Sequence, residues 1–164
     1  MPFTIFHIGP ALLIGFLLFS RLDFVSFMIS SVILDVEPLC IALFCPWMPL
    51  HGFFHSYLGA TFLGVLTAVG VYFLRSWLSM ILAWFKVQQE PSFKKMLYTS
   101  TLGVYFHVFL DSFLYAEMEP LYPLTGNPFF EVLGFGTIYG FCTASFIIGV
   151  ILYVYKFMIH QTTQ

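Results

Sequence analysis

Long runs of apolar residues divide this sequence, and most are long enough to cross a bilayer as a helix. A transmembrane helix needs about 20 such residues and satisfies its own backbone hydrogen bonds, as the bilayer interior requires. Of the 164 residues, 60% are hydrophobic and 9% are charged, whereas a soluble domain carries about 25% charged residues. We therefore predict an all-α membrane protein, a single transmembrane helical domain over residues 1–164. Its five predicted spans cover, approximately, residues 3–20, 24–44, 50–75, 95–116 and 132–159.

Prolines and loop-forming residues mark the interruptions. Pro10 predicts a kink in the first span, and Pro38 predicts a break in the second, because the residue before a proline resists the α conformation. Residues 76–94 contain tryptophans and lysines. They form either an amphipathic helix at the membrane interface or an extension of the third span with a turn at Pro91. Residues 117–131 are rich in proline and glycine and predict a loop.

The charged residues orient the predicted bundle. With five spans, all six Lys and Arg residues fall on one side, and the other side carries Glu117, Glu119 and Glu131. The positive-inside rule then places the N-terminus outside and the C-terminus in the cytoplasm of a multi-pass protein of the cell membrane. The net charge is −2, and the sequence has no polybasic tail that would indicate binding to nucleic acid.

Histidines and acids lie within the apolar sequence, where ionisable groups are costly and usually functional. His51 and His55 are four residues apart, as are His107 and Asp111. On a helix this spacing puts both side chains on one face, where they can bind one cation. The predicted topology places both pairs in the outer part of the bundle. Three further candidate ligands fall at a similar depth on the first two spans, namely His7, Asp35 and Glu37.

These residue types predict a divalent metal. Imidazole and carboxylate suit zinc, with manganese or iron as alternatives. Seven candidate ligands are more than one tetrahedral zinc needs, so either two ions share the site or some residues orient the ligands. Glu37 is either a ligand or a general base, and it converges with Asp35 only if the helix breaks near Pro38. Cys40 and Cys45 either form a disulfide or are small apolar residues.

Hydroxyl and acidic residues next to these candidates extend the predicted site. Ser56 and Ser112 each directly follow a candidate ligand. Each serine is either a nucleophile or a hydroxyl that supports packing and the metal ligands, and we favour the supporting role. In the loop after the fourth span, Glu117 and Glu119 either face solvent or act over the site. We select Glu37 and Glu119 as the candidate catalytic residues, which would transfer protons.

The order of these features resembles a known family. An N-terminal His, an acidic pair, His-x-x-x-His-Ser and His-x-x-x-Asp-Ser follow one another over about residues 7–127. This order resembles the YdjM-type family, whose members are described as inner-membrane metal-dependent hydrolases. The family usually has Asp-x-Asp where this chain has Asp35-Val36-Glu37, and often a basic residue where it has Gly52-Phe53-Phe54. A looser similarity to zinc-dependent phospholipase C enzymes implies a phosphoester substrate.

The expected function is that of an integral-membrane metal-dependent hydrolase. Metal-activated water would act on a lipid or phosphoester reached from the outer side, with membrane lipids as partners. A metal-ion transporter is one alternative, but it needs polar groups across the whole bilayer, and the inner halves of the predicted spans have few. A structural or regulatory membrane protein with a closed structural metal site is the other alternative.

Overall fold

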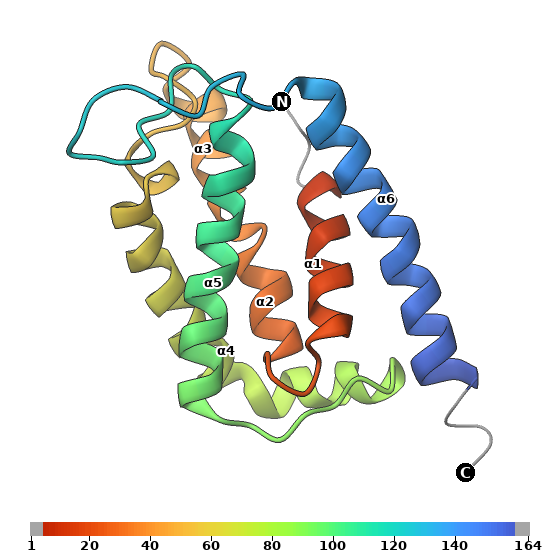
Figure 1. Ribbon diagram of the computed structural model, residues 1–164. Coiled ribbons are helices and arrows are strands. Elements are labelled where there is room, and N and C mark those ends of the chain that lie inside the picture. The colour runs from red at the N-terminus through yellow and green to blue at the C-terminus, as the bar shows by residue number, and fades with distance from the viewer. Residues whose placement is uncertain (1–4, 160–164) are drawn as a thin grey trace.

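The computed structural model describes residues 5–159, and no strand occurs in that range. Its helices stand side by side as a bundle (Figure 1). The all-helical prediction is confirmed for these residues, and residues 3 and 4 of the first predicted span lie outside them. The elements are α1 (Ile5–Leu17), α2 (Phe24–Ser30), η1 (Ile33–Asp35), α3 (Val36–Phe44), η2 (Phe53–His55), α4 (Tyr57–Trp84), α5 (Phe93–Ser112), α6 (Phe135–Tyr153) and η3 (Val154–Ile159).

Three helical stretches are long and apolar enough to cross a membrane: Phe24–Phe44, α4 and Phe135–Lys156. The first of them combines α2, η1 and α3, and α1 is an apolar but shorter helix. Within the described range α5 is not among the three, because it also carries lysines, hydroxyl side chains, His107 and Asp111. The outer faces of α4 and α6 expose large apolar side chains, as lipid contact requires. They include Phe62, Phe73, Ile147 and Ile151.

The second predicted span is broken, but the break comes before Pro38. α2 ends at Ser30, and η1 leads at Asp35 into α3, in which Pro38 is the third residue. A helix tolerates proline in its first turn, because the N–H groups there have no partner within the helix. The junction therefore lies at Asp35, and this side chain projects from between two helical segments.

The third predicted span is displaced along the chain. Instead of starting near residue 50, α4 begins at Tyr57, because Ser56 caps it by accepting a hydrogen bond from the Gly59 N–H at 3.0 Å. It then continues to Trp84, so residues 76–84 extend this helix. Figure 1 shows that this last part turns across the lower end of the bundle. The stretch thus belongs to α4 and yet lies across the bundle end, which combines features of both interpretations.

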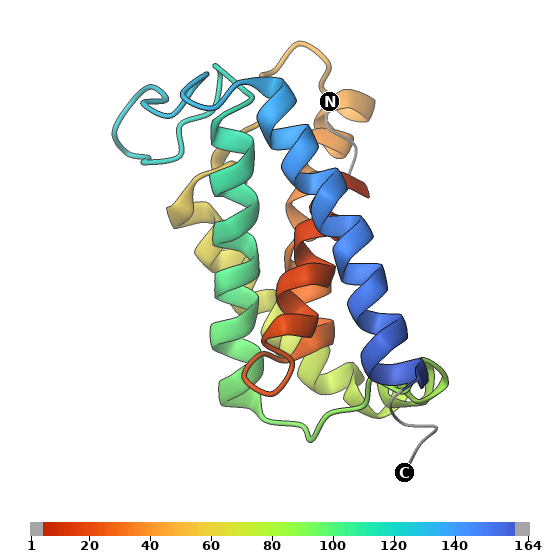
Figure 2. The same cartoon turned by 45° about the vertical axis from the view of Figure 1, so that its right-hand side comes forward.

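Close contacts between helices hold the bundle together. α1 packs on α6, and α5 packs on both α2 and α4; Figure 2 shows α1 beside α6 from a second direction. A Cβ atom on Gly9 of α1 would collide with the backbone oxygen of Cys142 in α6. One on Gly103 of α5 would collide with the Ser30 hydroxyl in α2. Glycine is therefore required at both positions for the helices to approach this closely.

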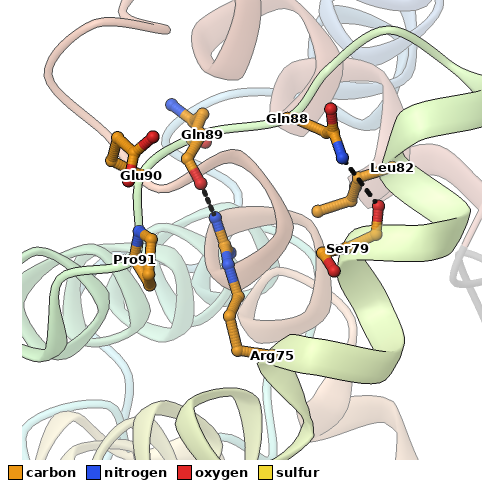
Figure 3. A pocket seen from close by; sticks show the side chains of 7 residues that line it. All are labelled: Arg75, Ser79, Leu82, Gln88, Gln89, Glu90 and Pro91. Carbon is orange, nitrogen blue, oxygen red and sulfur yellow. Dashed lines mark hydrogen bonds between the residues drawn. The ribbon is translucent and has the colours of Figure 1, made fainter.

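Arg75 closes the lower end of the bundle. Its Nη1 donates to Asp23 Oδ2 at 3.0 Å, and its Nη2 donates to the backbone oxygen of Gln89 at 2.7 Å (Figure 3). Both charged side chains are buried, and Asp23 is fully so. Gln89 in turn donates to the backbone oxygen of Leu22 at 2.8 Å. This network ties α4 to the loops that follow α1 and precede α5.

The loops at the two ends of the bundle differ in charge. The loop between α5 and α6 lies at the upper end in Figure 1, and the loops after α1 and after α4 lie at the lower end. The upper loop contains Glu117, Glu119 and Glu131 and no Lys or Arg. The lower loops contain Arg21 and Lys86 together with Asp23 and Glu90, and Lys94 and Lys95 begin α5 at the same end. The charge separation expected from the sequence is therefore present along the bundle axis.

Candidate metal centre

Six of the seven predicted ligands come together in the interior of the bundle. His7 comes from α1, Asp35 from the end of η1, and His107 and Asp111 from α5. Among the described residues these four form one group that could hold a metal ion, with candidate ligand atoms within 4.8 Å of one another. A second such group consists of His51, His55 and Asp111. Asp111 belongs to both groups, which makes it the centre of the arrangement.

The first group has spacings close to those of a coordination shell. His7 Nε2 lies 3.1 Å from Asp111 Oδ1, and His107 Nε2 lies 3.2 Å from Asp111 Oδ2. His107 Nε2 is also 3.8 Å from Asp35 Oδ1. Ligand atoms at zinc-binding distances in a tetrahedron are about 3.4 Å from one another. Small adjustments of these side chains would therefore place all four donors around one ion.

The hydrogen bond made by His107 Nδ1 determines which ring nitrogen is available to bind a metal. His107 Nδ1 lies 2.8 Å from the backbone oxygen of Ser31. A carbonyl only accepts hydrogen bonds, so Nδ1 carries a proton, and in the neutral ring Nε2 would present a lone pair to Asp111. A lone pair facing a carboxylate is unfavourable without a positive charge between them. A bound cation supplies that charge, and metal-binding histidines commonly donate their other ring N–H in this way.

The two histidines of the second group are held in the same tautomer by carboxylates. His55 Nδ1 donates to Glu37 Oε2 at 2.7 Å, and His51 Nδ1 donates to Glu117 Oε1 at 2.8 Å. His55 Nε2 is then directed toward Asp111 Oδ2, 3.9 Å away. Burial lowers the pKa of His55 despite the opposing effect of Glu37, so its ring is neutral and able to bind metal at neutral pH.

Polar atoms at the centre lack hydrogen-bond partners among the described residues. Buried polar atoms nearly always have such partners, because leaving them unpaired costs free energy. The contact between His7 Nε2 and Asp111 Oδ1 is short but lacks hydrogen-bond geometry. A divalent cation would satisfy those atoms that face Asp111, one nitrogen from each imidazole, so the donor set fits a metal. The unpaired atoms include both ring nitrogens of His7, Asp35 Oδ2, His55 Nε2, His107 Nε2 and Asp111 Oδ1.

Glu37 is the predicted ligand that joins neither group. Its Oε2 accepts from His55 Nδ1 and its Oε1 accepts from the Phe54 N–H at 3.2 Å. The side chain therefore supports a ligand instead of pointing at the centre. Gly52 makes this approach possible, because a Cβ atom there would lie 2.7 Å from Glu37 Oε1.

His51 and His55 do not lie one turn apart on a helix, although their spacing predicts it. Both residues precede α4: His51 lies in a loop and His55 ends η2. Their rings still lie edge to face with centroids 4.8 Å apart, because the turn through Gly52 folds the chain back on itself. His107 and Asp111 do lie one helical turn apart on α5, as their spacing predicts.

The serines next to the ligands bond to the backbone. Ser56 Oγ donates to the Phe53 oxygen at 2.7 Å while capping α4, and Ser112 Oγ donates to the Phe109 oxygen at 2.7 Å. Their hydroxyls stabilise the local backbone beside the ligands, which agrees with the supporting role. The cysteines, including Cys40 and Cys45, are free.

A cavity of about 550 Å³ adjoins the second group, and we call it the outer cavity. His51 forms part of its wall, beside the Glu37 and Glu117 carboxylates that hold the histidines. Glu119 and Tyr122 also line it. The outer cavity therefore brings one metal-binding histidine and the candidate acid Glu119 to the same space.

Some contributors to the centre are not visible in the sequence pattern. The Ser31 carbonyl is a backbone group, so no residue type marks it. Glu117 is one acid among several in its loop, and only the fold pairs it with His51. Tyr115 stacks on His51 with ring centroids 3.8 Å apart, and burial raises the pKa of its hydroxyl, which stays protonated. An aromatic residue four positions after Asp111 is the one signal that could have suggested it.

No protein-family model matches this sequence, and neither curated proteins nor solved structures show a significant match. The likeness to the YdjM-type family therefore depends on the order and spacing of the residues quoted for it.

Proposed function

We propose that this protein is an integral-membrane metal-dependent hydrolase whose metal is bound by the two donor groups around Asp111. One observation carries the proposal: the Nε2 atoms of three imidazoles converge on a buried carboxylate, and one oxygen of that carboxylate has no hydrogen-bond partner among the described residues. Imidazole and carboxylate together favour zinc, with manganese or iron as alternatives. The resemblance to the YdjM-type family supports the same reading.

Bound zinc would lower the pKa of a coordinated water to about 7 and so supply hydroxide for hydrolysis. The chain's own residues do the rest. Glu37 and Glu117 hold His55 and His51 in the metal-binding tautomer. Because Glu37 is engaged with His55, Glu119 is the better candidate for moving a proton in the outer cavity. Its carboxylate would take a proton from water or deliver one to the leaving group.

The substrate we propose is a lipid or other phosphoester. The donor groups contribute two carboxylates, Asp35 and Asp111, so one divalent cation leaves their charge neutral and two leave it positive. An oxygen of an anionic phosphoester could bind directly to a metal beside the outer cavity, whose wall also carries the Glu37, Glu117 and Glu119 carboxylates. The apolar outer faces of α4 and α6 suit a molecule that resides in the membrane.

We further propose that the chain crosses the membrane five times, with its N-terminus outside. The Lys and Arg residues at one end, and an acidic loop without them at the other, support this orientation. It places the donor groups and the outer cavity toward the extracytoplasmic face. The substrate would then enter from the outer leaflet.

The test is a hydrolysis assay on purified protein in lipid nanodiscs loaded with zinc or manganese. Fluorescent phospholipids and soluble phosphodiesters are the substrates. We expect metal-dependent hydrolysis by the wild type and by Glu131→Gln, a control in an exposed acid of the outer loop. Asp111→Asn should reduce hydrolysis to background. A metal-loaded wild type that hydrolyses none of these substrates would contradict the proposal, and metal flux into liposomes would favour a transporter.

A further inference from the structure

The two donor groups differ in their number of protein ligands and in whether a ligand lines a cavity. Building on the proposed function, we propose that they are two metal positions bridged by Asp111, with unequal roles. The inner position consists of His7, Asp35, His107 and Asp111, and it holds its ion tightly for structure and charge. The outer position consists of His51, His55 and Asp111, and it is the exchangeable position at which water and substrate bind.

The inner position has a full set of protein ligands. Four donors complete the tetrahedral shell that zinc adopts in closed sites. His7, His107 and Asp111 are buried, and the Asp35 side chain is 18% exposed. The rings of His7 and His107 also stack with centroids 3.9 Å apart, which restrains both side chains. A closed, restrained shell leaves little room for a substrate atom.

The outer position has one ligand fewer. Three protein donors with a vacant fourth direction are typical of catalytic zinc, since water or substrate occupies that direction. His51, one of the three, lines the outer cavity. No residue that lines the outer cavity belongs to the inner position alone. Substrate in the outer cavity would therefore meet the outer position first.

Asp111 is placed to serve both positions. Its Oδ1 lies 3.1 Å from His7 Nε2 of the inner position. Its Oδ2 lies between ligands of both positions, 3.2 Å from His107 Nε2 and 3.9 Å from His55 Nε2. A carboxylate that faces ligands of both positions can bridge two ions about 3.5–4 Å apart, a separation common in two-metal hydrolytic sites. One tetrahedral ion, by contrast, would leave two of the six donors unused.

The hydrogen-bond partners of the histidine Nδ1 atoms also differ between the two positions. Both histidines of the outer position donate Nδ1–H to carboxylates, Glu37 and Glu117, that also line the outer cavity. His107 of the inner position donates instead to the neutral Ser31 carbonyl. A carboxylate partner makes the imidazole a stronger donor. The two histidines of the outer position are therefore the stronger metal ligands, which partly offsets the absence of a fourth ligand.

Metal stoichiometry measured by mass spectrometry tests this inference without any activity assay. Wild-type protein and Glu131→Gln should each bind about two zinc ions, of which a weak chelator removes one readily. His51→Ala should keep only the chelator-resistant ion, and His7→Ala only the readily removed one. Asp111→Ala should lose both ions. Circular dichroism and gel filtration establish that each variant is folded, with Gln substitutions replacing any Ala variant that is not.

Each outcome separates this inference from the proposed function. One zinc per wild-type chain, lost equally in His51→Ala and His7→Ala, would overturn the two positions while leaving a single-metal hydrolase. Two ions bound as described, without hydrolysis of any substrate tested, would overturn the proposed function and support the two positions. Absence of zinc, manganese and iron binding by the folded wild type would overturn both.

Discussion

Glu37 Oε2 lies 2.7 Å from His55 Nδ1, and this contact joins the start of α3 to the turn before α4. The other oxygen of the same carboxylate accepts from the Phe54 N–H. One side chain thus fixes both the backbone of the turn and the orientation of the His55 ring. It directs His55 Nε2 toward Asp111 and so prepares the outer position for a metal.

Replacement of Glu37 by Gln should weaken metal binding. The amide oxygen can still accept from His55 Nδ1, but it lacks the charge that strengthens the imidazole donor. We expect zinc affinity to fall about 10- to 100-fold, the usual effect of losing such a partner. Competition with a chromophoric chelator measures the affinity, with Glu131→Gln as the control. Equal affinities in the Glu37→Gln variant and the wild type would show that the contact does not support a ligand.

Substitution of Gly52 by Ala should produce a similar loss by a steric route. The added Cβ atom would lie 2.7 Å from Glu37 Oε1 and push the carboxylate away from His55. Gly70→Ala in α4 is the matched control, because no other atom lies within 4 Å of a Cβ atom there. We expect weaker zinc binding only in Gly52→Ala. Added to Glu37→Gln, it should cause little further loss, since both changes disrupt one contact.

The helical architecture follows from the sequence because apolar runs in a bilayer have few alternatives to helices. The shared depth of the ligands could also be predicted from the sequence, since charge placement and helix count bring His7, His107 and Asp111 to one end of the bundle. The local course of the chain before α4 could not be predicted from the sequence. The start of α4 is set by the Ser56 cap, and an i,i+4 pair of histidines there looks the same whether it lies in a helix or in a turn.

The roles of the acids could not be assigned from residue type. Asp35 and Glu37 are both acids beside a predicted break, yet one joins a donor group and the other supports His55. Their difference arises because the helix junction lies at Asp35 instead of Pro38.

Ser56→Ala should cost stability and leave catalysis in place. Its hydroxyl caps α4, and removal of a helix cap costs about 1 kcal/mol. Thermal unfolding in detergent measures the destabilisation, with Ser112→Ala as a comparison that removes no cap. Loss of hydrolysis in a folded, metal-loaded Ser56→Ala protein would instead identify the hydroxyl as a nucleophile.

The Asp23–Arg75 ion pair at the lower end should contribute to the stability of the fold and not to metal binding. Arg75→Met leaves the buried Asp23 carboxylate without its partner, which costs about 3–5 kcal/mol. The double variant Asp23→Asn/Arg75→Met should recover part of that loss, because no buried charge remains. Thermal unfolding reports both effects. Zinc stoichiometry should be unchanged in every variant that folds, and a specific loss of zinc would link the two ends of the bundle.

X-ray absorption at the zinc edge tests the central claim most directly, because it reports which atoms surround the metal in the intact protein. The account predicts nitrogen and oxygen ligands at about 2.0–2.2 Å, with the outer-shell scattering of several imidazole rings and no sulfur. The imidazole signal should weaken in His107→Ala. A sulfur shell near about 2.3 Å would place the metal on the free cysteines and contradict the account.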